Sequence, residues 1–115
     1  MPKDWPKDLP LLRDKELNHI LYGDKKGGGH LYGHGWVHSR NEFNESLKAA
    51  HIIEALKNNA LPLEQLKAEF EKDDKTSIKR EATYNGVDFY IVYSLKTDKQ
   101  TREAIYKIIT AYPKK

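Results

Sequence analysis

The sequence contains no cysteine and no long apolar segment. The absence of cysteine excludes a disulfide scaffold, a cysteine-ligated metal site and a cysteine nucleophile. The apolar runs are too short for a transmembrane helix, and the first residues lack the apolar core of a signal peptide. Charged residues make up 32% of the 115 residues, but the net charge is only +3, which permits a polyanionic partner without requiring one. These properties predict a small, soluble single domain.

The first thirteen residues are predicted to form a flexible arm. Three prolines alternate with Lys-Asp pairs in this segment, which disfavours a helix. The arm offers four docking points to the remainder of the chain: Trp5, Leu9, Leu11 and Leu12. We therefore divide the chain into an arm over residues 1–13 and a domain over residues 14–115.

The first part of this domain shows helical patterns. The first helix is expected from a cap at Asp14 to Gly23. The second is expected from Ala49 to Ala60, with Asn44 or Ser46 as its cap, and the third from about Pro62 into the charged run 71–75. In the first helix, His19 lies opposite the apolar stripe.

The last part of the chain alternates apolar and polar residues, as strands do. A strand over residues 78–84 leads through Asn85-Gly86, a strong hairpin signal, into a second strand over residues 87–95. A final strand is expected over residues 104–112, where the alternation places four residues on one face: Tyr106, Ile108, Thr110 and Tyr112. Helices followed by antiparallel strands predict an α+β fold.

Residues 23–41 hold six of the seven glycines and three of the five histidines. So many glycines cannot sustain a helix, so we expect a functional loop, with a short strand pairing around Leu31 and Tyr32. His19 and His30 bracket the glycine run, and a loop that folds back would bring them together. Two such imidazoles can cleave a phosphodiester without a metal, one taking the proton of a ribose 2′-OH and the other protonating the departing 5′-oxygen.

Three histidines at intervals of four, His30, His34 and His38, suggest a different site that binds a metal. That spacing needs a helix, and Gly33 and Gly35 oppose one, so we expect no metal and no cofactor.

Three segments resemble the bacterial EndoU nuclease domain, a C-terminal toxin module of polymorphic and contact-dependent inhibition toxins. They are His19-Ile20-Leu21-Tyr22-Gly23-Asp24, Gly27-Gly28-Gly29-His30 and Ile109-Thr110-Ala111-Tyr112-Pro113. The resemblance spans roughly residues 17–113. One departure is Phe43-Asn44, where the family usually has Phe-Pro.

The resemblance implies a fold and an activity. The fold would be the α+β arrangement of the barnase/EndoU/colicin-type ribonucleases, with N-terminal helices followed by an antiparallel sheet. The activity would be uridine-preferring RNA cleavage, with tRNA among the candidate substrates, leaving 2′,3′-cyclic phosphate and 5′-OH ends. His19 and His30 would be the acid–base pair, and Thr110 and Tyr112 would position the substrate.

Further contacts to the substrate are expected around the loop. Gly28 and Gly29 would approach a phosphate through their backbone, while Lys26, His34 and Arg40 would contact it by charge. Many members of the family also use a lysine to steady the phosphate, and the candidates here are Lys25, Lys26, Lys48 and Lys57.

As a toxin module, the domain would act in the cytoplasm of a target cell after delivery by a larger N-terminal region outside this chain. It would also have a cognate immunity protein that covers the active site. Two other classes of function stay open: a non-catalytic module that binds RNA or protein, and a metallohydrolase that uses the three spaced histidines.

Overall fold

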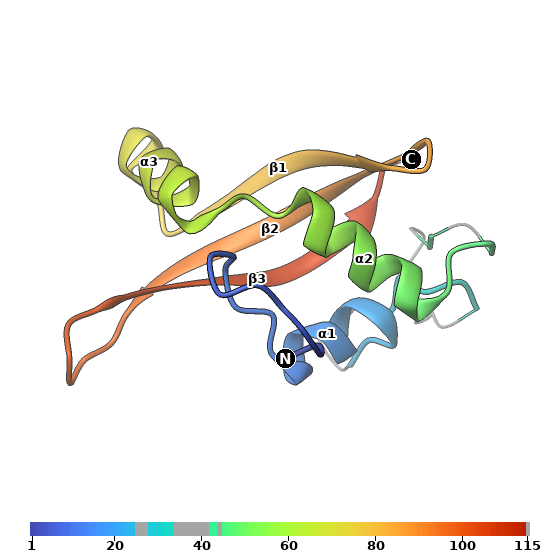
Figure 1. Ribbon diagram of the computed structural model, residues 1–115, viewed down its shortest axis with the longest axis horizontal. Helices are drawn as coiled ribbons and strands as arrows, with labels where there is room; N and C mark the ends of the chain where they lie inside the picture. The colour runs from blue at the N-terminus through green and yellow to red at the C-terminus, as the bar shows by residue number, and fades with distance from the viewer. Residues whose placement is uncertain (25–27, 34–41, 44, 115) are drawn as a thin grey trace.

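The computed structural model describes residues 1–24, 28–33, 42–43 and 45–114, and the description below is of these residues. Three helices come first: α1 (Asp14–Leu21), α2 (Ala49–Asn59) and α3 (Leu63–Asp73). Three strands follow them: β1 (Ser77–Tyr84), β2 (Val87–Thr97) and β3 (Ala104–Pro113). Figure 1 shows α2 lying across the sheet and α1 beside β3. The α+β fold expected from the sequence is confirmed at this level.

The sheet is an antiparallel meander in the order β1-β2-β3. Its first turn is the Asn85-Gly86 hairpin, and both residues have positive φ angles, +48° and +79°. A two-residue turn with both φ angles positive matches the right-handed twist of the strands that it joins. The hairpin signal in the sequence therefore located this turn correctly.

A β-bulge in β3 breaks the alternation that the sequence predicts. Val92 pairs with Thr110, but the next residue, Tyr93, pairs with Ile108, which leaves Ile109 as an extra residue in β3. Because of this extra residue, residues before and after Ile109 that simple alternation would place on one face of the sheet lie on opposite faces. Thr110 and Tyr112 do share a face, but Ile108 is fully buried in the core on the opposite face, so its expected place beside them is wrong.

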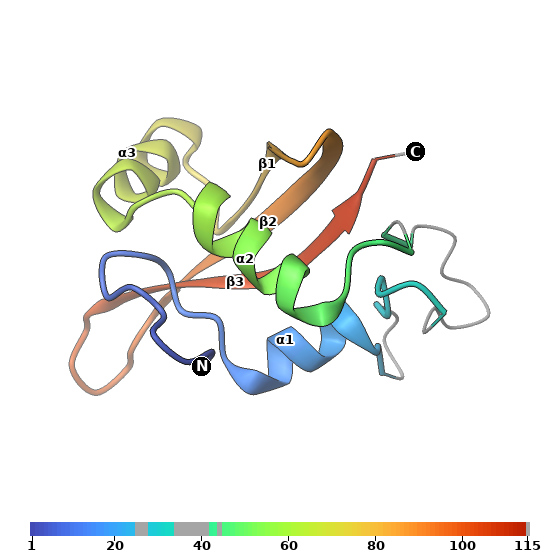
Figure 2. The same ribbon diagram turned by 45° about the vertical axis from the view of Figure 1, so that its right-hand side comes forward.

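The core lies between the helices and one face of the sheet (Figure 2). Phe89, Ile91 and Tyr93 of β2 are each 1% exposed on this face. Apolar residues of α2 and α3 complete the same cluster, among them Ile52, Leu56, Leu66 and Phe70. Sheet alternation thus assigns every second residue of β2 to the core.

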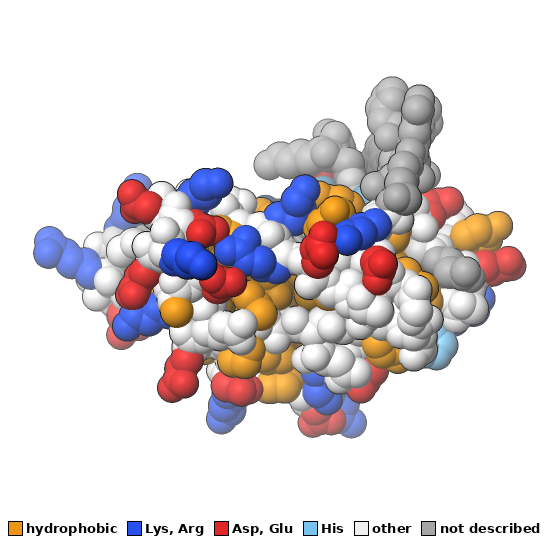
Figure 3. Space-filling model, turned by 90° about the horizontal axis from the view of Figure 1, so that it is seen from above, with side chains coloured by type: hydrophobic (Ala, Val, Ile, Leu, Met, Phe, Trp, Pro, Cys, Tyr) orange, Lys and Arg blue, Asp and Glu red, His pale blue; other side chains and the backbone are white. Residues whose placement is uncertain are grey.

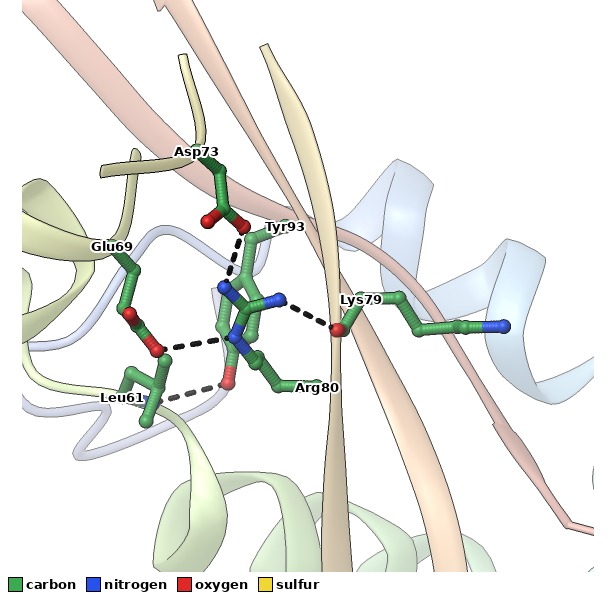
Figure 4. A network of polar contacts seen from close by, with 6 residues as sticks. All are labelled: Leu61, Glu69, Asp73, Lys79, Arg80 and Tyr93. Carbon is green, nitrogen blue, oxygen red and sulfur yellow. Dashed lines mark hydrogen bonds and ion pairs between the residues drawn. The ribbon is translucent and has the colours of Figure 1, made fainter. Parts of the chain in front are cut away.

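Polar contacts fix α3 to the sheet (Figure 4). Arg80 of β1 donates to Glu69 at 3.1 Å and to Asp73 at 2.8 Å, two carboxylates on successive turns of α3. Tyr93 accepts a hydrogen bond from the N–H of Leu61, between α2 and α3, at 3.1 Å. The start of α3 and its last turn are therefore both tied to the strands.

Residues 1–13 lie against the sheet and the helices. Trp5, Leu9 and Leu12 are buried, and the indole N–H of Trp5 donates to the carbonyl of Pro10 at 2.9 Å. Leu11 forms a parallel bridge with Lys107 at the free edge of β3. The segment thus supplies core residues and covers part of this edge, and Trp5, Leu9 and Leu12 are docked as expected.

The helices differ from the sequence expectations mainly at their first residues. Arg13 and Lys48 occupy the N-cap positions of α1 and α2, in place of Asp14 and of Ser46 or Asn44. Of the two expected caps of α2, Asn44 lies outside the described residues. No helix among the described residues has both the length and the apolar character needed to cross a membrane.

Candidate active site

The end of α1 places His19 beside the glycine-rich loop. Ile20 and Leu21 are buried and anchor the last turn, which leaves the His19 side chain on the other side at 22% exposure. The helix ends at Leu21 with Tyr22 as its C-cap, and Gly23 follows with a φ of +80° and an N–H that bonds to the carbonyl of Asn18 at 3.0 Å. Glycine adopts this left-handed conformation without strain, so it commonly ends helices.

The loop returns to the same helix end and satisfies its carbonyl groups. Three consecutive N–H groups, of Gly29, His30 and Leu31, donate to the carbonyls of His19, Ile20 and Leu21 at 2.9, 2.7 and 3.1 Å. The last carbonyls of a helix have no partner within the helix, so another segment must satisfy them. These bonds carry His30 back to the turn that holds His19, as the sequence predicts.

Gly28 passes too close to His19 for any other residue. A Cβ atom on Gly28 would lie 2.2 Å from the His19 carbonyl oxygen and 3.0 Å from two atoms of its ring, and φ is +79°. The N–H of Gly29 is already donated to the same carbonyl. In this structure the two glycines therefore let the loop pack against His19.

Asp24 contacts His19 directly and was not assigned a role from the sequence. Its Oδ2 lies 3.0 Å from Nδ1 of the imidazole, just beyond the end of the helix. A carboxylate at Nδ1 favours the tautomer with its proton on that nitrogen and leaves Nε2 for chemistry. The only signal in the sequence was an acidic residue five positions after His19, past the helix stop.

Aromatic rings connect His30 to the sheet. The centroid of its ring lies 5.7 Å from that of Tyr112, and Tyr112 lies 5.6 Å from Tyr90, its partner in the register of β2 and β3. The carbonyl of His30 accepts from the N–H of Phe43 at 2.6 Å, and Phe43 is buried against Phe89. His30 is thus held by its backbone bond to Phe43 and by the contact of its ring with Tyr112.

The face of the sheet opposite the core is here called the outer face. It is defined by five residues: Lys79, Tyr90, Val92, Thr110 and Tyr112. The structure therefore brings four of the expected catalytic residues to one end of the molecule. His19 and His30 come from the helix end and the loop, while Thr110 and Tyr112 come from the outer face. Tyr90 was missed because its place beside Tyr112 depends on the strand register.

Both basic and acidic side chains lie on and around this face. The ammonium groups of Lys79 and Lys114 lie 4.5 and 5.2 Å from the centre of the Tyr90 ring. Lys114 also pairs with Glu81 at 2.7 Å, and this hydrogen bond raises the pKa of Lys114. Viewed from the side of β1 and α3, basic and acidic side chains are interspersed (Figure 3). Such a surface permits contact with an anion without a strong long-range field.

Several expected site residues lie outside the described residues: Lys25, Lys26, His34, His38 and Arg40. The spaced-histidine metal site falls mostly among them. In the described part of the chain, no group of three side chains suited to holding a metal ion is present. His51 is exposed on α2 and accepts from the N–H of Lys48 at 3.0 Å, as expected of a surface histidine.

No family model matches the chain, and no curated protein or solved structure was found to match it. The function proposed below therefore rests on the geometry above and on the motif resemblance.

Proposed function

We propose that this chain is an endoribonuclease domain that cleaves RNA without a metal ion, by acid–base transesterification. The observation that supports it most is the return of the glycine loop to the end of α1. It brings His30 to the turn that carries His19 and next to Tyr112. Two imidazoles and a tyrosine from distant parts of the sequence thus gather at one end of the molecule.

The chemistry follows from the two imidazoles. One accepts the proton of the ribose 2′-OH while that oxygen forms a bond to phosphorus. The other donates a proton to the 5′-oxygen as its bond to phosphorus breaks. The products are a 2′,3′-cyclic phosphate and a 5′-OH, and the two histidines are left with exchanged protonation states. Which of His19 and His30 is the base is left open in this proposal.

Neighbouring groups have supporting roles in this proposal. Asp24 is a positioning residue that holds the His19 ring by its Nδ1. Tyr112 and Thr110 contact the substrate, with the Tyr112 ring against a base or ribose and the Thr110 hydroxyl at a base edge. The preference for uridine, with tRNA among the substrates, comes from the motif resemblance.

The biological setting in this proposal also rests on the resemblance. The domain would be a toxin module that a larger N-terminal region delivers to the cytoplasm of a target cell. A cognate immunity protein would cover the surface around His19 and His30. Co-expression with a candidate immunity protein tests this part, since restored growth is expected and continued growth arrest would contradict it.

The main test is an incubation of the pure domain, in EDTA, with a short RNA that contains one uridine. Mass spectrometry should find a cut beside the uridine with a cyclic phosphate on the upstream product. His19→Ala and His30→Ala should each be slower by roughly 10²–10⁴. His51→Ala is the matched control, because it removes an exposed histidine far along the chain and should retain the rate.

The pH dependence adds a second readout. Because one histidine acts unprotonated and the other protonated, the rate should pass through a maximum and fall at both more acidic and more alkaline pH. Full activity of His19→Ala would refute the assignment. Loss of wild-type cleavage in EDTA would favour the metallohydrolase, and binding without cleavage of either the short RNA or total tRNA would favour the binding module.

Asp24→Asn separates positioning from substrate binding. A neutral amide holds the His19 ring less firmly, so kcat should fall while KM stays near the wild-type value. Asp14→Asn, on an exposed position of α1, is the control and should change neither constant. An increase in KM with unchanged kcat would place Asp24 in substrate binding instead.

A further inference from the structure

A groove of about 480 Å³ lies beside the candidate active site, and the proposed function does not yet use it. Its lining includes Tyr112, Val92 and Lys79 of the outer face, together with Lys75 from the connection between α3 and β1. These residues come from all three strands, so the groove crosses the sheet over a width of about 10 Å. One of its walls, Tyr112, is the ring that contacts His30.

The groove carries a surplus of positive charge. Its one acidic residue, Asp73, is paired with Arg80 at 2.8 Å, which leaves the charges of Lys75 and Lys79 uncompensated within the lining. The ammonium of Lys79 lies 4.5 Å from the centre of the Tyr90 ring, an arrangement that keeps a lysine over the sheet through its attraction to the ring face. An anion that enters the groove therefore meets two cations.

The groove also offers an apolar and aromatic surface. Val92 and Tyr112 are both half-buried, and they belong to neighbouring strands of the outer face. Aromatic side chains on a sheet stack on unpaired bases, while basic side chains next to them follow the phosphate backbone. A duplex would present its backbone here and not its bases, so the combination favours a single strand.

We infer that this groove binds a nucleotide that flanks the cleaved dinucleotide in a single-stranded RNA. Its base lies against Tyr112 and Val92, and its phosphate lies near Lys75 and Lys79. This inference extends the proposed function, because it makes Tyr112 the boundary between the cleaved dinucleotide and the nucleotide that flanks it. RNA longer than a dinucleotide should then gain affinity and cleavage efficiency from the groove.

Binding is measured first, with a fluorescent RNA pentamer whose central uridine lacks the 2′-OH and cannot be cleaved. Lys75→Ala/Lys79→Ala should bind it roughly tenfold more weakly at low salt, and the slope of log Kd against log salt should fall by about 0.7, the value for one phosphate of a single strand. The control, Lys67→Ala/Lys99→Ala, removes the same charge outside the groove and should retain both values. Thermal unfolding of each variant confirms that the fold is intact.

Cleavage is measured next, on a uridine dinucleotide and on the cleavable pentamer. The variant Lys75→Ala/Lys79→Ala should lose roughly tenfold in kcat/KM on the pentamer. It should lose nothing on the dinucleotide, because the dinucleotide does not reach these two lysines. Equal losses on both substrates, or equal weakening in the control variant, would overturn the inference. A wild type that binds the pentamer through these lysines and cleaves neither substrate would refute the proposed function while supporting the groove.

Discussion

The two faces of the sheet share the same strands but differ in what their side chains contact. On β2, Ile91 and Tyr93 point into the core and are each 1% exposed, whereas Tyr90 and Val92, which alternate with them, lie on the outer face and are only half-buried. The inner residues pack against α2 and α3, and the outer ones lie near Tyr112 and His30. Stability and the proposed chemistry therefore depend on alternate residues of one strand, so each can be changed separately.

The largest expected effect compares two neighbours on β2. Ile91→Ala leaves a cavity in a closed core and should lower the free energy of unfolding by about 2–5 kcal/mol. Val92→Ala removes two methyl groups from a half-buried position and should cost less than about 1 kcal/mol. Urea unfolding of both variants measures the difference. Similar losses would show that the outer face is packed as tightly as the core.

The next largest effect compares two tyrosines on opposite faces. Tyr93→Phe removes the acceptor of the Leu61 N–H bond and should cost about 0.5–1.5 kcal/mol, because a partly buried donor loses its partner. Tyr90→Phe keeps the ring that lies under Lys79 and should change stability by less than about 0.5 kcal/mol. Equal effects on unfolding would contradict the separation of the faces at this position.

The stability of the protein at alkaline pH tests the burial of Tyr93 in a second way. Burial raises the pKa of Tyr93 to about 12, from an ordinary value of 10.0. The unfolded chain therefore loses this proton before the folded chain does, and ionisation favours unfolding between pH 10 and 12. The stability of the wild type should fall more steeply over this range than that of Tyr93→Phe. Parallel curves would show that Tyr93 does not contribute to the alkaline loss.

The sequence predicted the elements better than their relative placement. The helix over 49–60 and the turn at Asn85-Gly86 were recognisable because periodicity and turn chemistry are local properties. The bulge at Ile109 was not, because an extra residue in a strand is defined by its pairing with the neighbouring strand, which the sequence of β3 alone does not specify. Its consequence, Ile108 in the core, depends on pairing with a strand more than ten residues away.

The same difference between local patterns and relative placement applies to the residues of the candidate site. His19 and His30 could be identified because a glycine run between them permits the loop to return, and the structure shows that return in three backbone hydrogen bonds. Asp24 and Tyr90 could not be assigned, because the contacts of both are set by geometry. Asp24 depends on where α1 stops, and Tyr90 depends on the register between β2 and β3.

The smallest expected effect concerns the contact between α3 and the inner side of β1. The hydrogen bond from Arg80 lowers the pKa of Asp73 below its ordinary value of 3.8. Because the folded state holds this carboxylate ionised, its contribution to stability is present above pH 3.8 and is lost as the pH falls through the lower folded value. Both side chains are about 30% exposed, so screening by water keeps the effect modest.

Asp73→Asn tests this contact, with Glu71→Gln as the control from an exposed position of the same helix. Above pH 4, Asp73→Asn should be slightly less stable than the wild type, and the difference should shrink as the pH falls towards 2. Glu71→Gln should follow the wild-type curve, since Arg80 is not bonded to it. A difference that persists unchanged at low pH would show that Asp73 acts through packing and not through its charge. The anchoring of α3 would then depend on the polar contacts of Glu69 and Tyr93 and on the burial of apolar residues in the core.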